Sequence, residues 1–167
     1  MNCMDCKIDP VSEKDGREII DLFNHYIESS FAAYPEKKVP YEFFQLFLNM
    51  TCGYPFLAAK SNAGEIIGFG LLHPHNPMPA FSQTAEITYF IAPEYTGKGI
   101  GKALLVRLLD AARQKGITSI LASISSLNPG SLAFHKKNGF VECGRFVGIG
   151  KKGGKNFDVI WMQKMIE

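Results

Sequence analysis

The chain has 167 residues, of which 46% are hydrophobic and 20% charged, and its net charge is +2. This length suits one domain with a sizeable core, so we expect a single domain over residues 1–167. A net charge this small argues against nucleic-acid binding through the overall field, and no stretch approaches the roughly 20 apolar residues of a membrane span. The N-terminus lacks the apolar run of a signal peptide, which makes a cytoplasmic location the expectation.

The first part of the chain alternates strand-like and helical patterns. Cys3 and Cys6 have the spacing of metal and redox sites, but no second ligand pair follows, so we expect free thiols in a reducing compartment. A short strand is expected at 7–8, an amphipathic helix over 15–30 and a second helix over 41–49. Strands over 56–60 and 65–72 then form a predicted hairpin, with its turn at 62–64.

A loop from His73 to Phe81 follows the hairpin, and its three prolines predict neither a helix nor a regular ladder. The pair His73 and His75 lacks the sulfur or acidic partner of a metal site, so contact with substrate or solvent is the preferred interpretation and no metal is expected. Asn76 and Phe81 are weaker candidates for lining a substrate pocket.

The rest of the chain continues the alternation. A strand over 85–91 leads through a glycine-rich loop into a helix over 100–115, which Gly116 ends. A strand over 117–125 follows, and then a helix that begins with Asn128 as N-cap and Pro129 at its first position. A pair of strands over 140–147 and 157–165 ends the chain. The pattern predicts an α/β domain with a mixed sheet. The apolar stripe of the 100–115 helix is expected to include Ile100, Leu104, Leu108 and Ala111.

The glycine-rich loop, Thr96–Lys102, has the features of a phosphate site. Gly97, Gly99 and Gly101 alternate with other residues and let the backbone approach a ligand closely. A helix begins at the same place, so unpaired N–H groups and a positive dipole end point toward the ligand. These features predict a phosphate-bearing ligand.

Two common phosphate motifs do not fit this loop. A Walker loop requires G-x-x-x-x-G-K-[ST], whereas Lys102 is followed by Ala103. A dinucleotide fingerprint requires G-x-G-x-x-G and an acidic residue about 20 positions on, where this chain has Leu121 and Ala122. Neither a nucleoside triphosphate nor a dinucleotide is therefore favoured.

The loop and the stretch from Asn128 to Phe140 together resemble the GNAT superfamily of N-acetyltransferases. The family's loop pattern is [Q/R]-x-x-G-x-[G/A], which the chain matches except for Thr96 at the first position. Its second pattern, N-x-x-[A/S]-x-x-x-Y-x-[K/R]-x-G-F, is matched with His135 in place of the tyrosine. The resemblance implies a mixed, twisted central sheet flanked by helices, and acetyl-CoA as co-substrate.

The chain is more narrowly similar to the phosphinothricin N-acetyltransferase-like branch of amino-acid N-acetyltransferases. His135 is typical of that branch, as are residues 24–27, Glu86 and residues 158–163. This likeness implies transfer of acetyl to the α-amine of a small amino acid or analogue, of the phosphinothricin, methionine sulfone or methionine sulfoximine type. It also implies a homodimer, because members of the branch are commonly dimers.

The resemblance further implies which residues bind acetyl-CoA. The backbone of the preceding strand pairs with the pantetheine arm, and one of its N–H groups faces the thioester carbonyl. Asn128 and Ser131 lie where the family contacts the same arm. The residues expected at the co-substrate are Tyr89, Phe90 and Ile91 of the strand, Thr96, Gly97, Lys98, Gly99, Ile100, Gly101 and Lys102 of the loop, and Asn128 and Ser131.

Two side chains are candidates for proton transfer. Glu86 is the candidate base for the ammonium group, and strand alternation places it on one face with Thr88, which would line the acceptor side. An ordinary solvent-facing or salt-bridged glutamate is the alternative. His135 is the candidate acid for the leaving thiolate, and a packing or capping histidine is the alternative.

Other functions stay open at this point. The acceptor could be another amine, such as a protein N-terminus, a polyamine or an antibiotic. A different class is a non-catalytic sensor that binds acetyl-CoA. Only an enzyme would release free thiol from acetyl-CoA when an amine is added.

Overall fold

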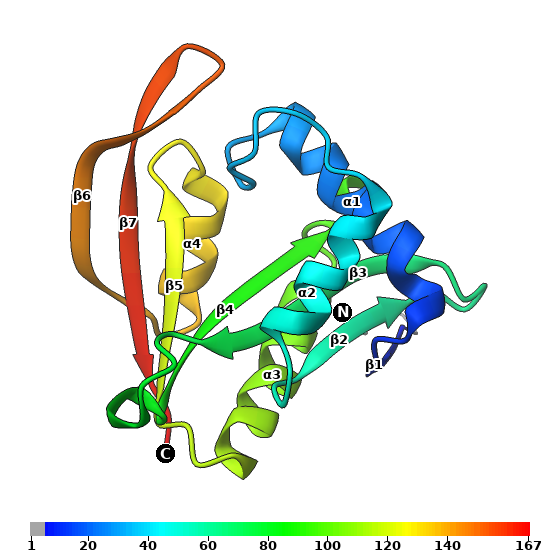
Figure 1. The fold of residues 1–167 in the computed structure, drawn as a ribbon, viewed down its shortest axis with the longest axis horizontal. Helices are drawn as coiled ribbons and strands as arrows, with labels where there is room; N and C mark the ends of the chain where they lie inside the picture. Colours follow the sequence, from blue (N-terminus) through cyan, green and yellow to red (C-terminus); the bar gives the residue numbers. More distant parts are fainter. Residues whose placement is uncertain (1–5) are drawn as a thin grey trace.

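A computed structural model describes residues 6–167, and these residues form one seven-stranded sheet with the strand order β1-β2-β3-β4-β5-β7-β6 (Figure 1). The interpretation of Cys3 lies outside the described residues. All neighbouring strands run antiparallel except β4 and β5, which are parallel. The predicted mixed sheet is therefore confirmed.

The first part of the chain supplies one edge of the sheet and two helices. Strand β1 (Lys7–Pro10) pairs with β2, and α1 (Gly16–Ser29) and α2 (Phe44–Met50) follow at the expected places. A single 3₁₀ turn leads into each helix. Strands β2 (Phe56–Lys60) and β3 (Ile66–Pro74) form the predicted hairpin.

The second part begins with β4 (Thr84–Ile91), which leads into α3 (Ile100–Gln114). Strand β5 (Ser119–Ser125) and α4 (Pro129–Lys137) come next. The chain ends in a long hairpin of β6 (Val141–Lys152) and β7 (Lys155–Met165), which projects beyond the rest of the sheet in Figure 1.

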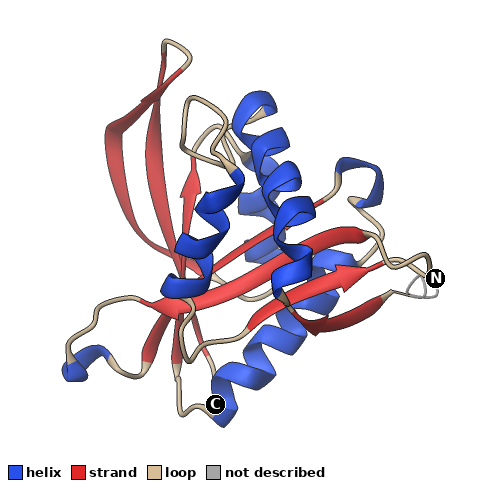
Figure 2. Ribbon diagram, turned by 45° about the vertical axis from the view of Figure 1, so that its right-hand side comes forward, coloured by secondary structure: helices blue, strands red, loops and turns tan. Residues whose placement is uncertain are grey.

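Helices cover both faces of the sheet (Figure 2). On one face, α1 and α2 bury an aromatic cluster against β2, β3 and β4 that includes Phe23, Phe47 and Phe69. On the other face, α3 buries Leu104 and Leu108 among aliphatic side chains of the same strands. In β4 the buried apolar residues alternate between these two cores, as strand geometry requires: Ala85 and Ile87 belong to the core beneath α3, and Phe90 belongs to the aromatic cluster.

Three details differ from the expectations. The first two residues of the loop at His73–Phe81 belong to β3 and pair with β4. Pro74 is tolerated there because a proline at the end of a strand need not donate an N–H to the ladder. The last three residues of the loop form a 3₁₀ turn. Ala112, rather than the partly buried Ala111, belongs to the core beneath α3. The glycine- and lysine-rich segment 148–156 lies mostly within β6 and β7 and turns at Gly153 and Gly154.

The parallel pair in the centre of the sheet is short. Strands β4 and β5 pair over Thr84–Glu86 and Ser119–Leu121, and beyond these residues the two strands diverge (Figure 1). The sheet is therefore split along part of its length, with β1 to β4 on one side and β5 to β7 on the other. No helix within residues 6–167 is both long enough and apolar enough to cross a membrane.

Candidate active site

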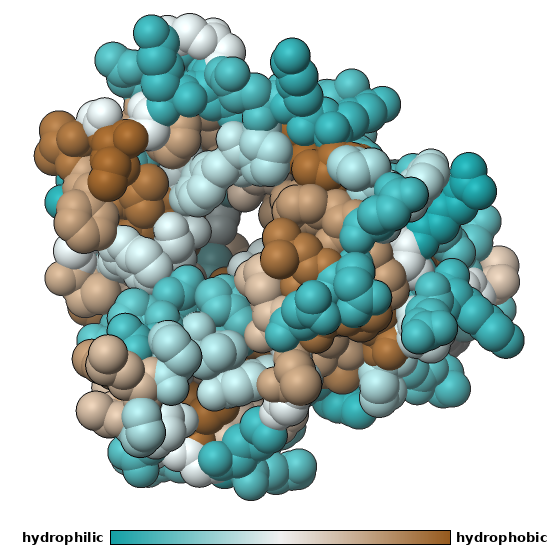
Figure 3. All heavy atoms as spheres, in the orientation of Figure 1, coloured by the Kyte–Doolittle hydropathy of each residue, from teal (hydrophilic) through white to brown (hydrophobic). Residues whose placement is uncertain are grey.

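A cavity of about 400 Å³ lies where β4 and β5 diverge. Figure 3 shows this part of the molecule as a hollow between the two halves of the sheet. Consecutive residues of both strands line the cavity, from Glu86 to Phe90 on β4 and from Ala122 to Ser125 on β5. The start of α4 forms a further wall, and residues 32–35 after α1, with aromatic side chains of α1, of α2 and of the turn before α2, form the wall next to these helices.

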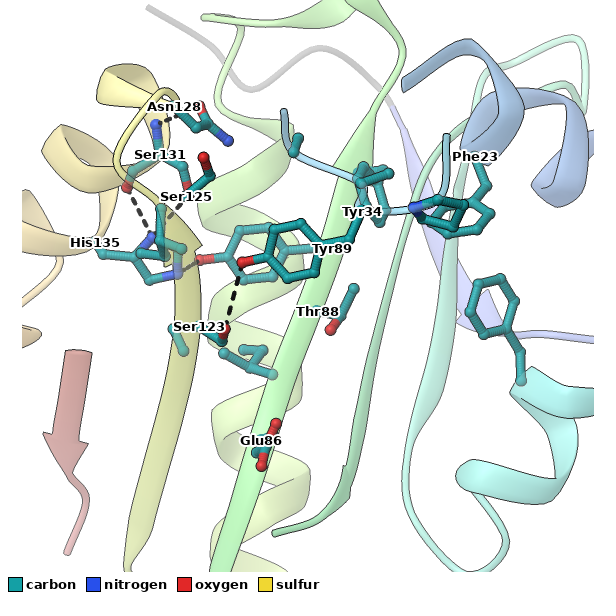
Figure 4. Close-up of a pocket in the computed structure, with 18 of the residues that line it drawn as sticks. Phe23, Tyr34, Glu86, Thr88, Tyr89, Ser123, Ser125, Asn128, Ser131 and His135 are labelled. Carbon is teal, nitrogen blue, oxygen red and sulfur yellow. Dashed lines mark hydrogen bonds between the residues drawn. The ribbon is translucent and has the colours of Figure 1, made fainter. Parts of the chain in front are cut away.

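Glu86 and Thr88 both line this cavity, on the face of the sheet that α1 and α2 cover (Figure 4). The neighbouring Phe90 packs in the aromatic core of that face, whereas Ile87 and Tyr89 belong to the core beneath α3. The predicted strand phase is therefore confirmed, without a bulge. The Glu86 carboxylate is the one carboxylate among the described residues that line the cavity.

His135 lies on the opposite side of the cavity and is buried in α4. Its Nε2 lies 2.5 Å from the hydroxyl of Tyr89, and the two rings stack with their centroids 5.4 Å apart (Figure 4). Its Nδ1 lies 2.7 Å from the backbone carbonyl of Ser131. The sequence predicted His135 at this site but not its partner, because 46 residues separate the two side chains.

These contacts fix the hydrogens of the pair. A carbonyl oxygen can only accept, so Nδ1 of His135 carries the hydrogen and donates it to Ser131. Burial lowers the pKa of His135, an effect that the Ser131 carbonyl partly offsets, so the ring is neutral and its Nε2 is an acceptor. The Tyr89 hydroxyl therefore donates to Nε2. Burial raises the pKa of Tyr89 and keeps that hydroxyl protonated.

The start of α4 is fixed by the N-cap that the sequence predicted. The side chain of Asn128 accepts a hydrogen bond from the backbone N–H of Ser131 at 3.2 Å, and Pro129 occupies the first helical position. Both Asn128 and Ser131 line the cavity. This cap places the first turn of α4 beside the diverging end of β5, as required for the predicted contacts with a ligand in the cleft.

The glycine-rich loop has the backbone that its sequence indicates. Gly97 and Gly99 have φ angles of 74° and 89°, a region that favours glycine, and the space beside each is open. The loop from Thr96 to Gly99 is exposed, and α3 begins immediately after it. Gly101 packs next to Phe134 of α4, so the start of α3 lies close to α4. These residues leave backbone N–H groups available to an anion.

A wall of the cavity that the sequence did not reveal is formed by the segment after α1. The Tyr34 hydroxyl lies 3.4 Å from Ser123 Oγ of β5, so this side chain crosses the cleft (Figure 4). Its ring stacks on Phe157 of β7. The ammonium group of Lys152 donates to the carbonyls of Ile27, Ser30 and Ala33 at 2.6–2.7 Å and ties the same segment to β6. The residues that make these contacts are 89 or more positions apart, so no local sequence pattern indicated them.

Two residues proposed for the acceptor pocket lie outside the cavity lining. The Asn76 side chain closes a local turn by accepting from the N–H of Met78, and Phe81 packs near His75. Among residues 6–167, no cluster of three or more His, Cys, Asp or Glu side chains is arranged to hold a metal ion.

Comparison with known proteins identifies the family of the chain. The model of the acetyltransferase (GNAT) family matches residues 19–140, a range that contains the diverging strands β4 and β5, the glycine-rich loop and α4. The chain belongs to the GNAT acetyltransferase family. The recognised motifs and the fold are thereby confirmed.

Individual members of the GNAT family cover nearly the whole chain. An L-methionine sulfoximine/L-methionine sulfone acetyltransferase of Pseudomonas paraeruginosa is 30% identical over 147 residues, covering 87% of this chain and 86% of the relative. The structure of a GNAT superfamily phosphinothricin acetyltransferase from Sinorhizobium meliloti, in complex with acetyl-CoA, matches with a TM-score of 0.91 and 28% identity, over 98% of this chain and 89% of that one. The structure of a ribosomal-protein-alanine N-acetyltransferase from Brucella melitensis matches with a TM-score of 0.89 and 30% identity, over 96% and 99%.

Proposed function

We propose that this protein transfers the acetyl group of acetyl-CoA to the α-amine of a small amino acid or amino-acid analogue. The observation that carries the proposal is the cleft between β4 and β5, which brings one carboxylate and the Tyr89–His135 pair to the same cavity. Relatives named for methionine sulfoximine, methionine sulfone and phosphinothricin support this class of acceptor. A cavity of about 400 Å³ is in the range of small-molecule sites.

The residues of the glycine-rich loop fit the pyrophosphate of acetyl-CoA. The positive φ angles of Gly97 and Gly99 and the open space beside them leave the backbone accessible to a bulky anion. The first N–H groups of α3 add donors and the positive end of the helix dipole. Lys98 and Lys102 lie exposed in the same segment and add positive charge. Thr96, which replaces the usual long polar residue, hydrogen-bonds the carbonyl of Pro93.

Bound acetyl-CoA supplies an activated thioester. In our proposal Glu86 accepts one proton of the acceptor's ammonium group, directly or through a water, and the resulting amine attacks the carbonyl carbon. The C–S bond then breaks, and the second proton that the nitrogen loses goes to the departing sulfur or to water. A backbone N–H of Tyr89, Phe90 or Ile91, on the diverging edge of β4, donates to the carbonyl oxygen as negative charge develops there. Holding both reactants in one cleft also removes the entropic cost of bringing them together.

The leaving thiolate is assigned to the Tyr89–His135 side of the cavity. Neutral His135 has no hydrogen on Nε2, so the transferable hydrogen of the pair is on the Tyr89 hydroxyl. We therefore propose that the Tyr89 hydroxyl turns from Nε2 of His135 to the sulfur as the C–S bond breaks and donates its hydrogen bond there, and that His135 holds the hydroxyl in place until then. Thiolates are good leaving groups, so this contact is expected to matter less than the base.

A thiol-release assay tests the proposed function. The protein is incubated with acetyl-CoA and single amino acids, methionine sulfone, methionine sulfoximine, phosphinothricin, polyamines and short peptides, and free thiol is measured. We expect amine-stimulated release with an amino acid or analogue and an N-acetylated product of the matching mass. Thermal protection by acetyl-CoA without release by any of these amines would contradict the proposal and favour a sensor.

A protein N-terminus is the second candidate acceptor, because the ribosomal-protein-alanine N-acetyltransferase of Brucella melitensis is also 30% identical to this chain. Release with an alanine-initiated peptide and not with free amino acids would favour that function. The enclosed acceptor side of the cavity, where Tyr34 crosses the cleft, favours the smaller acceptor.

A homodimer and a cytoplasmic location belong to the same proposal. Strand β6 is an edge strand with exposed apolar side chains, including Val141, Val147 and Ile149, and such edges pair readily with another strand. Light scattering of the purified protein is expected to give twice the monomer mass. Cys52 and Cys143 are free thiols, which suits a reducing compartment.

A further inference from the structure

His75 lies directly behind the carboxylate that we assign as the base. Its Nδ1 is 2.8 Å from Oε1 of Glu86, whereas Oε2 makes no hydrogen bond within the described residues. Glu86 lines the cavity and His75 does not, so the carboxylate lies between the cavity and the ring. About one third of the His75 side chain is exposed, at 34% against 21% for Glu86.

The ring of His75 is held by aromatic side chains from two other elements. Phe81 of the 3₁₀ turn meets it at an interplanar angle of 69°, with centroids 6.1 Å apart. Trp161 of β7 meets it at 83° and 6.2 Å. Edge-on contacts of this kind favour one orientation of the ring, so the direction of its Nδ1–H bond is set before any ligand binds.

The contact requires a hydrogen on Nδ1. An ionised carboxylate can only accept, so Nδ1 of His75 donates to Oε1 of Glu86 whether the ring is neutral or charged. This hydrogen bond restricts the carboxylate's rotation and leaves Oε2 for the acceptor's ammonium group.

We propose that His75 is a positioning residue for Glu86, which fixes the carboxylate at the cavity wall while the acceptor binds. This inference rests on the proposed function, in which Glu86 is the base. It also gives a purpose to the proline-rich loop, because Phe81 and the turn after Pro77 hold the ring against the strand.

Few other titratable or charged side chains lie near Glu86 and His75. His73, directly opposite Glu86 on β3, has Nε2 3.7 Å from Oε2, which is beyond hydrogen-bond reach but close enough for a charge effect when that ring is protonated. The remaining titratable side chains of the cavity are Tyr34, Tyr89 and His135. From β7, the side chain packed against His75 is the uncharged Trp161.

The test compares three substitutions at one position. In His75→Asn the amide nitrogen occupies the place of Nδ1 and keeps the donor without a titrating ring, whereas His75→Gln puts its amide near the place of Nε2 and His75→Ala has no donor. The exposed His25 of α1 gives a matched control, His25→Asn. For each variant, kcat and KM are measured from pH 5.5 to 9 with the best acceptor of the thiol-release assay.

We expect His75→Ala and His75→Gln to lower kcat about tenfold across this pH range, because the carboxylate is no longer held toward the acceptor. The KM for acetyl-CoA is expected to stay unchanged. His75→Asn and His25→Asn are expected to follow the wild-type profile. Superimposable profiles for all variants, or equal losses in His75→Asn and His75→Gln, would overturn the proposal, since a packing role does not distinguish these two amides.

A readout that needs no turnover separates this inference from the proposed function. The Nδ1–H signal of the His75 ring is recorded by NMR in the wild type and in Glu86→Ala. Loss of the acceptor oxygen is expected to let this hydrogen exchange with water, so that its signal broadens or disappears. An unchanged signal in Glu86→Ala overturns the inference even if the enzyme acetylates amino acids, whereas an inactive wild type with the expected loss of signal contradicts only the proposed function.

Discussion

Glu86 lines the cavity and is also hydrogen-bonded by the protein. Nδ1 of His75 donates to one oxygen of its carboxylate, so the group is both accessible to an amine and restricted in orientation. A base in this position needs no movement of the chain to receive a proton. The consequence for catalysis can be tested with an isosteric substitution.

We expect Glu86→Gln to lower kcat about 100-fold or more with little change in acetyl-CoA affinity, because the amide has nearly the same shape and cannot accept the proton. Steady-state thiol release gives kcat, and isothermal titration gives the affinity. Glu94→Gln, at an exposed position before the glycine-rich loop, is the matched control and should retain activity. Equal activities of the two variants would make Glu86 an ordinary structural glutamate.

His135 makes stability depend on pH in a defined direction. Burial lowers its pKa, so below about pH 6.5 the unfolded chain takes up a proton that the folded protein does not. The stabilising contribution is therefore complete above about pH 6.5 and is lost as the pH falls toward the folded-state pKa. We expect the melting temperature to fall between pH 7 and pH 5, and to fall less steeply in His135→Gln.

Calorimetry at several pH values measures this effect. One proton taken up on unfolding changes the free energy of unfolding by at most about 1.4 kcal/mol per pH unit. Parallel pH dependences for the wild type and His135→Gln would show that the ring takes up its proton at the same pH in the folded and the unfolded protein. The Tyr89 hydrogen bond would then reverse at low pH, since the charged ring would donate from Nε2.

Individual side chains were predictable where a local rule applied. Strand alternation placed Glu86 and Thr88 on one face, and the Asn128–Pro129 pair marked the start of α4. The contacts that give these residues their chemistry were not predictable, because they join distant parts of the chain. Tyr89 was assigned only a backbone role, and its hydroxyl became relevant when the fold placed it at His135.

At the level of elements, the glycine-rich loop and α3 act as one unit. Gly97 and Gly99 adopt left-handed backbone conformations immediately before the helix, and Gly116 adopts one immediately after it, at φ 73°. The two ends of α3 thus have similar backbone requirements, and only the first lies at the proposed anion site. This symmetry provides an internal control.

We expect Gly99→Ala and Gly116→Ala each to destabilise the protein by about 1–2 kcal/mol, because both force a side chain into a left-handed conformation. Only Gly99→Ala should also weaken acetyl-CoA binding, since it alone alters the backbone at the pyrophosphate. Chemical denaturation and isothermal titration measure the two effects. Equal acetyl-CoA affinities in the two variants would contradict the assignment of the loop.

The elements themselves followed from periodicity, and the limits of the two long helices nearly did. Helices α1 and α3 were expected within two residues of their observed ends, since apolar spacing defines both and Gly116 marks the end of α3. The terminal hairpin is longer than expected because pairing across the strands outweighs the low strand preference of the glycines in segment 148–156. The start of the loop at His73 joined β3 for a similar reason.

At the scale of the whole molecule, long-range ties connect the two halves of the split sheet. Lys152 donates to three carbonyls around the end of α1, and Tyr34 stacks on Phe157 and reaches Ser123. The terminal hairpin therefore supports the segment that covers the cleft. The family motifs were sufficient to predict the fold, whereas these ties depend on side chains that have no motif.

We expect Lys152→Met to lower the melting temperature by about 5–10 °C, because three carbonyls lose a charged donor and the net loss is about 2–3 kcal/mol. The KM for the amine should rise more than that for acetyl-CoA, because residues 32–35 line the cavity on the side that we propose for the acceptor. The neighbouring Lys151 is exposed, and Lys151→Met is the control. Wild-type melting and an unchanged amine KM in Lys152→Met would exclude a supporting role.

The divergence of β4 and β5 gives the sheet a second pair of edges inside the molecule. Strand edges on a surface offer unpaired backbone groups to any passing chain and promote aggregation. Here the segment after α1 and the start of α4 line the same cavity as the two strands, so these walls limit access to the inner edges. The outer edge at β6, in contrast, carries exposed apolar side chains such as Val147 and Ile149.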